Sequence, residues 1–108
     1  MRRALLPLLL LCATPALAAE HVVTQSYRQF SVGGAKAETL AVKSGDTLAF
    51  RNDDRFAHNV FSRTAGQEFD LGTMRPGASG ERRFDKPGTV EVECALHPQM
   101  KFKVEIKP

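Results

Sequence analysis

The sequence lacks any hydrophobic run long enough to cross a membrane as a helix. Its longest apolar stretch, Ala4 to Cys12, is well short of the roughly 20 residues that such a helix needs. Two arginines precede this stretch, and Ala16-Leu17-Ala18 follows it with small residues at the positions that signal peptidase reads. We therefore expect residues 1–18 to be a cleaved signal peptide and residues 19–108 to form a single exported domain without membrane insertion.

The sequence also lacks a strong excess of charge of either sign. It contains 15 Lys and Arg against 12 Asp and Glu, and Arg2 and Arg3 fall within the expected signal peptide, which leaves 13 basic side chains against 12 acidic ones. A nearly balanced chain gives no electrostatic basis for binding nucleic acid. No Ser-His-Asp set, paired-carboxylate pattern or phosphate-binding glycine loop is present. We expect no nucleic acid partner and no catalytic residues.

Cysteine is scarce. Of the 2 cysteines, Cys12 lies in the expected signal peptide, so the mature chain retains Cys94 alone. Exported cysteines usually form disulfides. An unpaired Cys94 is therefore either a small buried hydrophobic residue or a residue with a chemical role.

Helical periodicity is almost absent after residue 18, and alternation with a period of two takes its place. The segments TVEVEC (89–94) and MKFKVEI (100–106) alternate apolar and charged residues, which is typical of strands with one wet face. This pattern predicts an all-β fold, a Greek-key β-sandwich of about eight strands in two antiparallel sheets. The expected strands cover residues 21–32, 38–42, 47–52, 58–61, 68–71, 80–84, 89–94 and 100–106.

Four unusual side chains stand out against this β-pattern: His58, Cys94, His97 and Met100. Alternation directs Cys94 into the sandwich at the end of a strand, and the short loop after it contains His97. A short loop can turn its thiolate, imidazole and thioether inward, while His58 on a distant strand supplies a fourth donor. We therefore expect these side chains to converge.

The chemistry of these donors favours one copper ion that alternates between Cu(I) and Cu(II). Two imidazoles and a thiolate with a weak axial thioether form the ligand set of a blue copper site. Zinc prefers four strong donors, and methionine is not one of them. A binuclear copper centre needs a second cysteine, and multicopper oxidases need more than the 3 histidines present.

The sequence HNV at His58, followed 36 residues later by C-x-x-H-x-x-M from Cys94, resembles the cupredoxin family of blue copper proteins related to plastocyanin and azurin. Its ligand loop is similar to that of the amicyanin branch. The resemblance implies that His58, Cys94 and His97 are the strong metal ligands and Met100 is the axial one. It also implies that Asn59 ties the two ligand loops together, with its backbone N–H directed at the Cys94 sulfur.

The resemblance further implies a periplasmic, monomeric one-electron carrier that meets larger redox proteins transiently, such as a dehydrogenase, a cytochrome or an oxidase. Four ligands leave no open position for a substrate, so we expect no enzymatic activity. Electrons would pass through His97, with Phe56, Ala95 and Pro98 forming a small docking patch around it.

Two alternatives to electron transfer remain at this point. One is a periplasmic protein that buffers or delivers copper with the same ligands, and the other is a metal-free adhesion-type sandwich with a buried free cysteine.

Two further features of the sequence are interpreted without a role in metal binding. Asp53 and Asp54 are expected to form a solvated turn before the strand that carries His58. His21, close to the cleavage site, is treated as an ordinary surface histidine.

Overall fold

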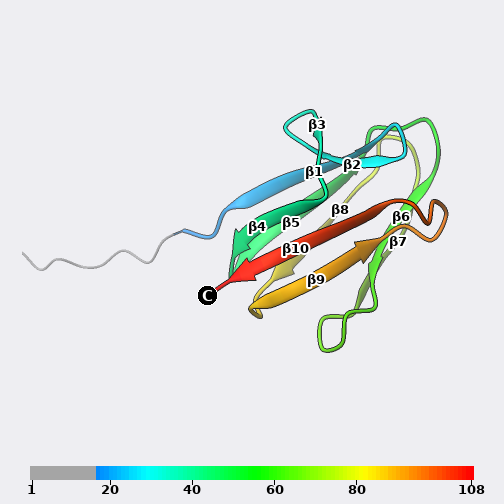
Figure 1. Cartoon of the computed structure of the whole chain (residues 1–108). Coiled ribbons are helices and arrows are strands. Elements are labelled where there is room, and N and C mark those ends of the chain that lie inside the picture. The colour runs from blue at the N-terminus through cyan, green and yellow to red at the C-terminus, as the bar shows by residue number, and fades with distance from the viewer. Residues whose placement is uncertain (1–16) are drawn as a thin grey trace, which may run out of the picture.

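The computed structural model describes residues 17–108. These residues form ten strands in two five-stranded sheets that pack face to face, and they contain no helix (Figure 1). The predicted all-β sandwich is therefore confirmed. The strands are β1 (Glu20–Ser26), β2 (Gln29–Val32), β3 (Ala35–Lys36), β4 (Thr39–Lys43), β5 (Asp46–Asn52), β6 (His58–Ser62), β7 (Phe69–Met74), β8 (Ser79–Phe84), β9 (Gly88–Glu93) and β10 (Lys101–Lys107).

The two sheets are mixed, so the expectation of purely antiparallel sheets is wrong. One sheet has the order β3-β2-β1-β5-β8 and the other β4-β10-β9-β6-β7. Strand β1 pairs in parallel with β5, and β4 pairs in parallel with β10. Parallel neighbours need a long crossover connection. Here the chain between the paired strands passes through the opposite sheet, which supplies that crossover without a helix.

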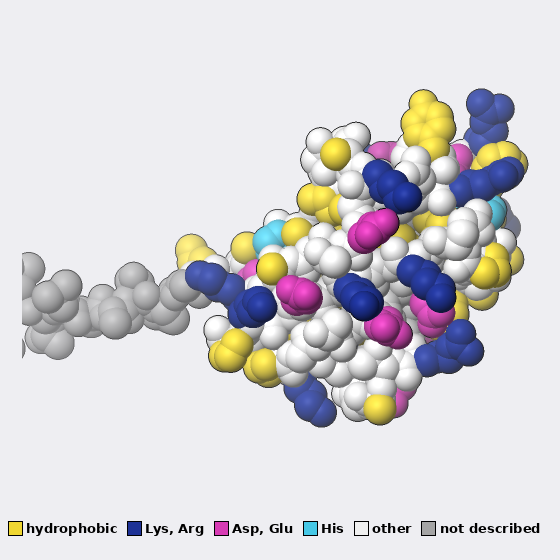
Figure 2. All heavy atoms as spheres, in the orientation of Figure 1, with side chains coloured by type: hydrophobic (Ala, Val, Ile, Leu, Met, Phe, Trp, Pro, Cys, Tyr) yellow, Lys and Arg dark blue, Asp and Glu magenta, His cyan; other side chains and the backbone are white. Residues whose placement is uncertain are grey.

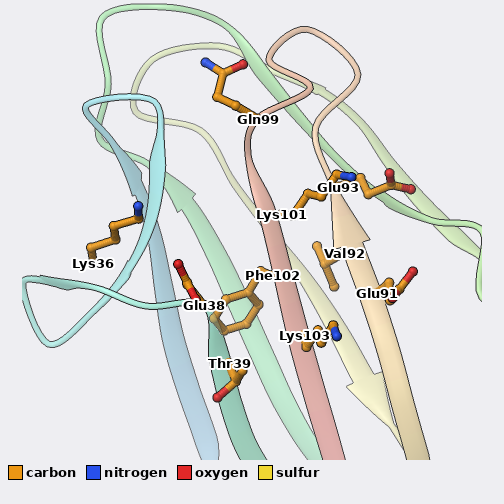
Figure 3. Close-up of a pocket in the computed structure, with 10 residues that line it drawn as sticks. All are labelled: Lys36, Glu38, Thr39, Glu91, Val92, Glu93, Gln99, Lys101, Phe102 and Lys103. Atoms are coloured by element: carbon orange, nitrogen blue, oxygen red, sulfur yellow. The ribbon is translucent and has the colours of Figure 1, made fainter.

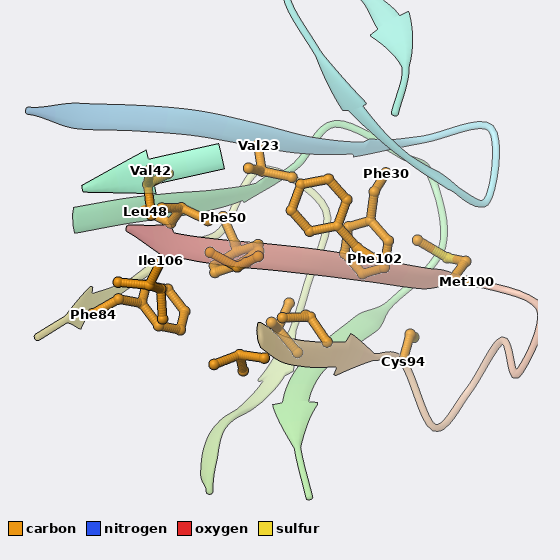
Figure 4. Packing of buried hydrophobic residues seen from close by; sticks show 14 of the residues in the cluster. Val23, Phe30, Val42, Leu48, Phe50, Phe84, Cys94, Met100, Phe102 and Ile106 are labelled. Carbon is orange, nitrogen blue, oxygen red and sulfur yellow. The ribbon is translucent and has the colours of Figure 1, made fainter. Parts of the chain in front are cut away.

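The core lies between the two sheets, as the alternation predicts. Val90, Val92 and Cys94 are buried, while Glu91 between them is exposed. Figure 4 shows Phe30 of β2 facing Phe102 of β10 across the sandwich, with 5.5 Å between the ring centroids. Burying a side chain of this size contributes about 1.5–3 kcal/mol, so these contacts hold the two sheets together.

The segment expected as one strand, residues 21–32, is instead a hairpin of β1 and β2. Tyr27 and Arg28 form its turn with φ values of 52° and 57°, a region that side chains other than glycine rarely adopt. The backbone N–H of Arg28 donates a hydrogen bond of 2.8 Å to Asp54 Oδ2, which lies in a distant loop. A tertiary contact therefore supports a turn that has no glycine or proline to signal it.

The connections that carry the predicted ligands meet at one end of the sandwich. Residues 94–100 join β9 to β10, and residues 53–57 lead into β6. Asn52 organises the second connection from a fully buried position. Its Nδ2 donates to the carbonyl of Phe56 at 2.8 Å, and its Oδ1 accepts from the N–H of Asp54 at 2.9 Å.

Almost all of the expected signal peptide, residues 1–18, lies outside the described residues, so it stays a prediction. Within residues 17–108, no helix has the length and hydropathy that a membrane span requires.

Candidate metal centre

Three of the four predicted ligands converge at the end of the sandwich. His58 opens β6 and is fully buried, Cys94 follows the last residue of β9 and is 1% exposed, and His97 lies in the next loop. Their donor atoms all lie within 4.8 Å of one another. The structure thus brings three of the four predicted side chains together from separate parts of the chain, and their role as ligands stays a prediction.

The separations between these donors suit a shared ion. Cys94 Sγ lies 3.7 Å from His58 Nδ1 and 3.9 Å from His97 Nδ1. The two Nδ1 atoms lie 3.0 Å apart. Typical metal–nitrogen and metal–sulfur bonds of about 2.0–2.3 Å limit donors of one ion to separations below about 4.6 Å. All three measured distances meet this limit, so the residues present fit a mononuclear site with one thiolate and two imidazoles.

Met100 is buried beside this group, immediately before β10. Its side chain is 2% exposed, and Figure 4 shows it with Cys94 at the same end of the hydrophobic core. The Met100 N–H donates a hydrogen bond of 2.9 Å to the carbonyl of His97, which closes the ligand loop into a compact turn. This placement suits the predicted axial thioether, whose role as a ligand stays a prediction.

Asn59 connects the two loops that carry the ligands. Its Oδ1 accepts a hydrogen bond of 2.7 Å from the N–H of Ala95, the residue after Cys94. The backbone carbonyl of Asn59 accepts a longer hydrogen bond of 3.4 Å from Gln25 Nε2 in the opposite sheet. The predicted tie between the loops is therefore present, and the Asn59 side chain makes it. The contact from its backbone N–H to the Cys94 sulfur stays a prediction.

Asp54 is the site residue that the sequence analysis missed. Its Oδ2 lies 3.0 Å from His58 Nε2, and its side chain is only 9% exposed, so the expectation of a solvated turn is wrong for this residue. An acidic residue four positions before the ligand histidine was the available signal. The contact forms because the Asn52 hydrogen bonds fold the connection back on itself.

The protonation of Asp54 determines which nitrogen of His58 is available to a metal. Burial raises the pKa of Asp54, but hydrogen bonds from the N–H of Arg28, from His58 and from the N–H of Arg55 outweigh burial and hold that pKa below its usual value. An ionised carboxylate only accepts hydrogen bonds, so His58 Nε2 carries the proton. Nδ1 is then the ring nitrogen that faces Cys94 and His97, and an outer carboxylate commonly orients a metal-binding histidine in this way.

His97 occupies the outer side of the centre and is partly exposed. Burial lowers the pKa of His97, and the positive charge of His58 in its protonated form and that of Arg28 lower it further. Both effects favour the neutral imidazole, which is the form that binds a metal. The Phe56 ring lies 6.4 Å from the His97 ring, and the Arg28 guanidinium lies 4.4 Å from the centroid of Phe56.

A separate pocket of about 360 Å³ lies on the outer face of the sheet that contains β9 and β10 (Figure 3). Its lining carries side chains of both charge signs from β9 and β10 and from the segment around β3 and β4, and it includes none of the four predicted ligands. The metal centre is therefore not part of this pocket. The lining residues are Lys36, Glu38, Thr39, Glu91, Val92, Glu93, Gln99, Lys101, Phe102 and Lys103.

Two curated proteins are similar to this chain in sequence, and they identify its family. No protein-family model matches the chain. The methylamine utilization protein MauL of Methylorubrum extorquens is 33% identical over 98 residues, an alignment that covers 88% of this chain and 82% of MauL. Amicyanin-alpha of the same organism is 30% identical over 100 residues, covering 88% of this chain and 84% of the relative.

Solved structures show the same fold. A reduced amicyanin variant superposes with a TM-score of 0.72 at 23% identity, with 82% of each chain covered. A copper-containing nitrite reductase from Thermus scotoductus gives the same TM-score at 21% identity, but this chain spans only 22% of the reductase. With the sandwich, the convergent donors and the two curated relatives taken together, the chain belongs to the cupredoxin family, among its amicyanin-like members.

Proposed function

We propose that this protein is a mononuclear blue copper protein that carries one electron at a time between larger redox proteins. The main support is that the donor atoms of His58, Cys94 and His97 lie within 4.8 Å of one another. The chain is also related to amicyanin-alpha. One thiolate and two imidazoles form the strong donor set of a blue copper site, and the buried Met100 provides the axial thioether.

Each side chain has a defined part in this function. When bound, copper supplies a one-electron couple between Cu(I) and Cu(II). Cys94 provides the thiolate, and His58 is held in orientation by Asp54. The tie between Asn59 and Ala95 and the turn closed by Met100 fix the loop around the donors. A site held this firmly changes little when the oxidation state changes, which suits an electron carrier.

His97 provides the route between the centre and a partner protein. It is the ligand nearest the surface, and Phe56 and Leu96 beside it are 41% and 53% exposed. These side chains form a small apolar contact surface, and transient redox encounters need no larger one. Four protein ligands leave no open position for a substrate, so the protein acts as a carrier and not as an enzyme. We propose that it works as a monomer.

The proposed location is the periplasm. Residues 1–18 have the charge, the apolar run and the small residues of a signal peptide, and cleavage after Ala18 would make Ala19 the first residue of the mature chain. The expected partners are a dehydrogenase that donates electrons and a cytochrome or oxidase that accepts them.

The visible spectrum after addition of Cu(II) tests this function. We expect the mature protein to form one blue copper centre and to become intensely blue or green because the Cys94 thiolate donates charge to the metal. The colour should disappear on reduction. A weak, nearly colourless Cu(II) complex in folded protein would refute the proposal, and full colour in Cys94→Ser would show that the ligand assignment is wrong.

A further inference from the structure

A second group of polar atoms, separate from the candidate metal centre, lies at the opposite end of the sandwich, where β1 begins (Figure 1). The Asp46 carboxylate, at the start of β5, is 4% exposed. Its Oδ1 accepts a hydrogen bond of 2.9 Å from the Ala19 nitrogen, and its Oδ2 lies 2.9 Å from His21 Nε2. One carboxylate therefore brings the Ala19 nitrogen and the His21 imidazole together.

Asp46 also determines which His21 nitrogen is free. Its Oδ2 also accepts a hydrogen bond of 2.9 Å from the N–H of Lys43, so both of its oxygens accept hydrogen bonds from backbone nitrogens. A carboxylate that accepts backbone hydrogen bonds on both oxygens acts as an acceptor, so His21 Nε2 is the donor in its contact with Asp46. His21 Nδ1 is then the ring nitrogen left for a metal, and a carboxylate on the far nitrogen is the usual support for a metal-binding histidine.

We propose that the mature chain carries a second metal site, formed by the α-amine of Ala19, the peptide nitrogens of Glu20 and His21, and the Nδ1 atom of His21, which binds Cu(II) or Ni(II). This proposal rests on the cleavage after Ala18 that is proposed above, because cleavage converts the Ala19 amide into a free amine. A free amine with histidine at the third position forms three fused chelate rings around one ion. Four nitrogens in a plane suit Cu(II) and Ni(II).

The start of β1 has room to adopt this arrangement. Residues Glu20 to Val23 pair with β5 alone, because the pairing of β1 with β2 begins only at Thr24. Glu20 is exposed, and His21 retains a side-chain exposure of 28%. Binding needs the peptide nitrogens of Glu20 and His21 to turn toward the ion and to release their protons. This opens only the first pairs with β5, including the 3.0 Å hydrogen bond from the Thr47 N–H to the Ala19 carbonyl.

The site is chemically distinct from the cupredoxin centre. It contains no sulfur, so a Cu(II) ion there lacks the intense thiolate absorption. A plane of four nitrogens also favours Cu(II) over Cu(I), so this copper would not take part in the one-electron cycle. The position at the opposite end of the strands keeps it away from the proposed docking surface around His97.

Nickel titration of the exported, processed protein tests the proposal. Intact mass first establishes that the chain begins at Ala19. The cupredoxin centre is first loaded with one equivalent of Cu(I), which a plane of four nitrogens disfavours, and this copper is oxidised until the blue colour develops. NiCl₂ is then added alone. We expect one further equivalent to bind and to give the yellow, diamagnetic spectrum of planar Ni(II), with the blue band unchanged. Amide exchange at Thr47 should become faster on binding.

Three variants supply the controls. His21→Gln should lose the nickel equivalent, and so should a chain with one additional glycine ahead of Ala19, which keeps every side chain but moves His21 to the fourth position. Asp46→Asn should bind nickel about 10- to 100-fold more weakly, the usual effect of removing the outer partner of a metal-binding histidine. Unchanged nickel binding in His21→Gln or in the extended chain would overturn the proposal. Unchanged nickel binding in Asp46→Asn would show that Asp46 does not support His21 as a ligand.

The two metal sites are tested independently. Cys94→Ser should lose the blue colour and keep the planar nickel spectrum. If the wild-type protein turns blue but binds no nickel, the second site fails while the proposed function stands. A chain that begins at a residue other than Ala19 would overturn the second site and the proposed cleavage point, and the blue copper centre would stand.

Discussion

Asp54 is the residue with the most direct influence on the predicted ligands, since its Oδ2 accepts a hydrogen bond of 3.0 Å from His58 Nε2. Asp54→Asn keeps an oxygen that accepts this hydrogen bond but removes a buried negative charge. That charge favours the more positive, oxidised site, so we expect its loss to raise the reduction potential by tens of millivolts, the order that a Coulomb estimate gives at this depth. Voltammetry of the copper-loaded protein measures the shift.

Asp53 provides a matched control for this prediction. It carries the same charge one position earlier, but it is exposed and pairs with Arg51 at 2.8 Å. Solvent screens such a pair strongly, so Asp53→Asn should leave the potential nearly unchanged. Equal shifts in the two variants would mean that net charge, and not the contact with His58, sets the potential.

Met100 is the second residue whose role a substitution defines. Met100→Leu keeps the volume of this buried side chain but removes its sulfur, so copper should remain bound at His58, Cys94 and His97 while the potential rises. Met100→Gln introduces a harder donor and should lower the potential. The visible spectrum and voltammetry report both effects. If neither changes in Met100→Leu, the residue is an ordinary core side chain.

At the scale of elements, Asp46 joins the start of β1 to the turn between β4 and β5. It accepts hydrogen bonds from the backbone nitrogens of Ala19 and Lys43 and contacts the His21 ring. These bonds hold the pKa of Asp46 at about 2, below the ordinary value of 3.8. A carboxyl group whose pKa is lower in the folded state than in the unfolded state stabilises the fold above the unfolded value. This contribution is lost as the pH falls from 3.8 toward about 2.

Asp46→Asn should therefore lower the melting temperature at neutral pH, and its difference from the wild type should shrink as the pH falls below about 4. Thermal unfolding of both proteins between pH 7 and pH 2 measures this, since a paired carboxylate loses its contribution on protonation. Asp85→Asn is a suitable control because Asp85 pairs with Arg83 only at the surface. A difference between the wild type and Asp46→Asn that is constant across this range would contradict the assigned role of the Asp46 charge.

At the scale of the whole molecule, positive charge gathers at the end that carries the metal centre. Arg28 and Arg55 lie in the two connections beside Phe56, and Arg75 follows Met74, which pairs with His58. None of the ion pairs found within residues 17–108 involves these three arginines. Figure 2 shows basic and hydrophobic side chains together at the end opposite the grey segment. This surface suits a partner with an acidic docking face.

Salt dependence tests this charge distribution. Oxidation of the reduced protein by the ferricyanide anion should slow as the ionic strength rises, because salt screens the attraction between the anion and these arginines. Arg55→Glu should slow the reaction at low salt and weaken its salt dependence. Lys43→Glu reverses a charge at the other end of the sandwich and should have a much smaller effect. Equal effects of the two substitutions would show that only net charge matters.

The amino-acid sequence by itself determined the features that depend on local pattern. Alternation in residues 89–94 and 100–106 placed Cys94 in the interior, because side chains of a strand point to opposite faces in turn. The spacing from Cys94 through His97 to Met100 fits one short loop, so the sequence could predict a donor set without coordinates. The all-β class and most strand positions followed from the same period-two pattern.

Only the tertiary structure decided the features that depend on which distant segments meet. The parallel pairing of β1 with β5 arises from crossovers through the other sheet, and the turn at Tyr27 and Arg28 depends on a contact with Asp54. The contact between Asp54 and His58, and the approach of Ala19 and His21 to Asp46, have no periodic signature. Hydrogen bonds between loops form when the packed sheets bring the loops together, so packing, and not local propensity, selects them.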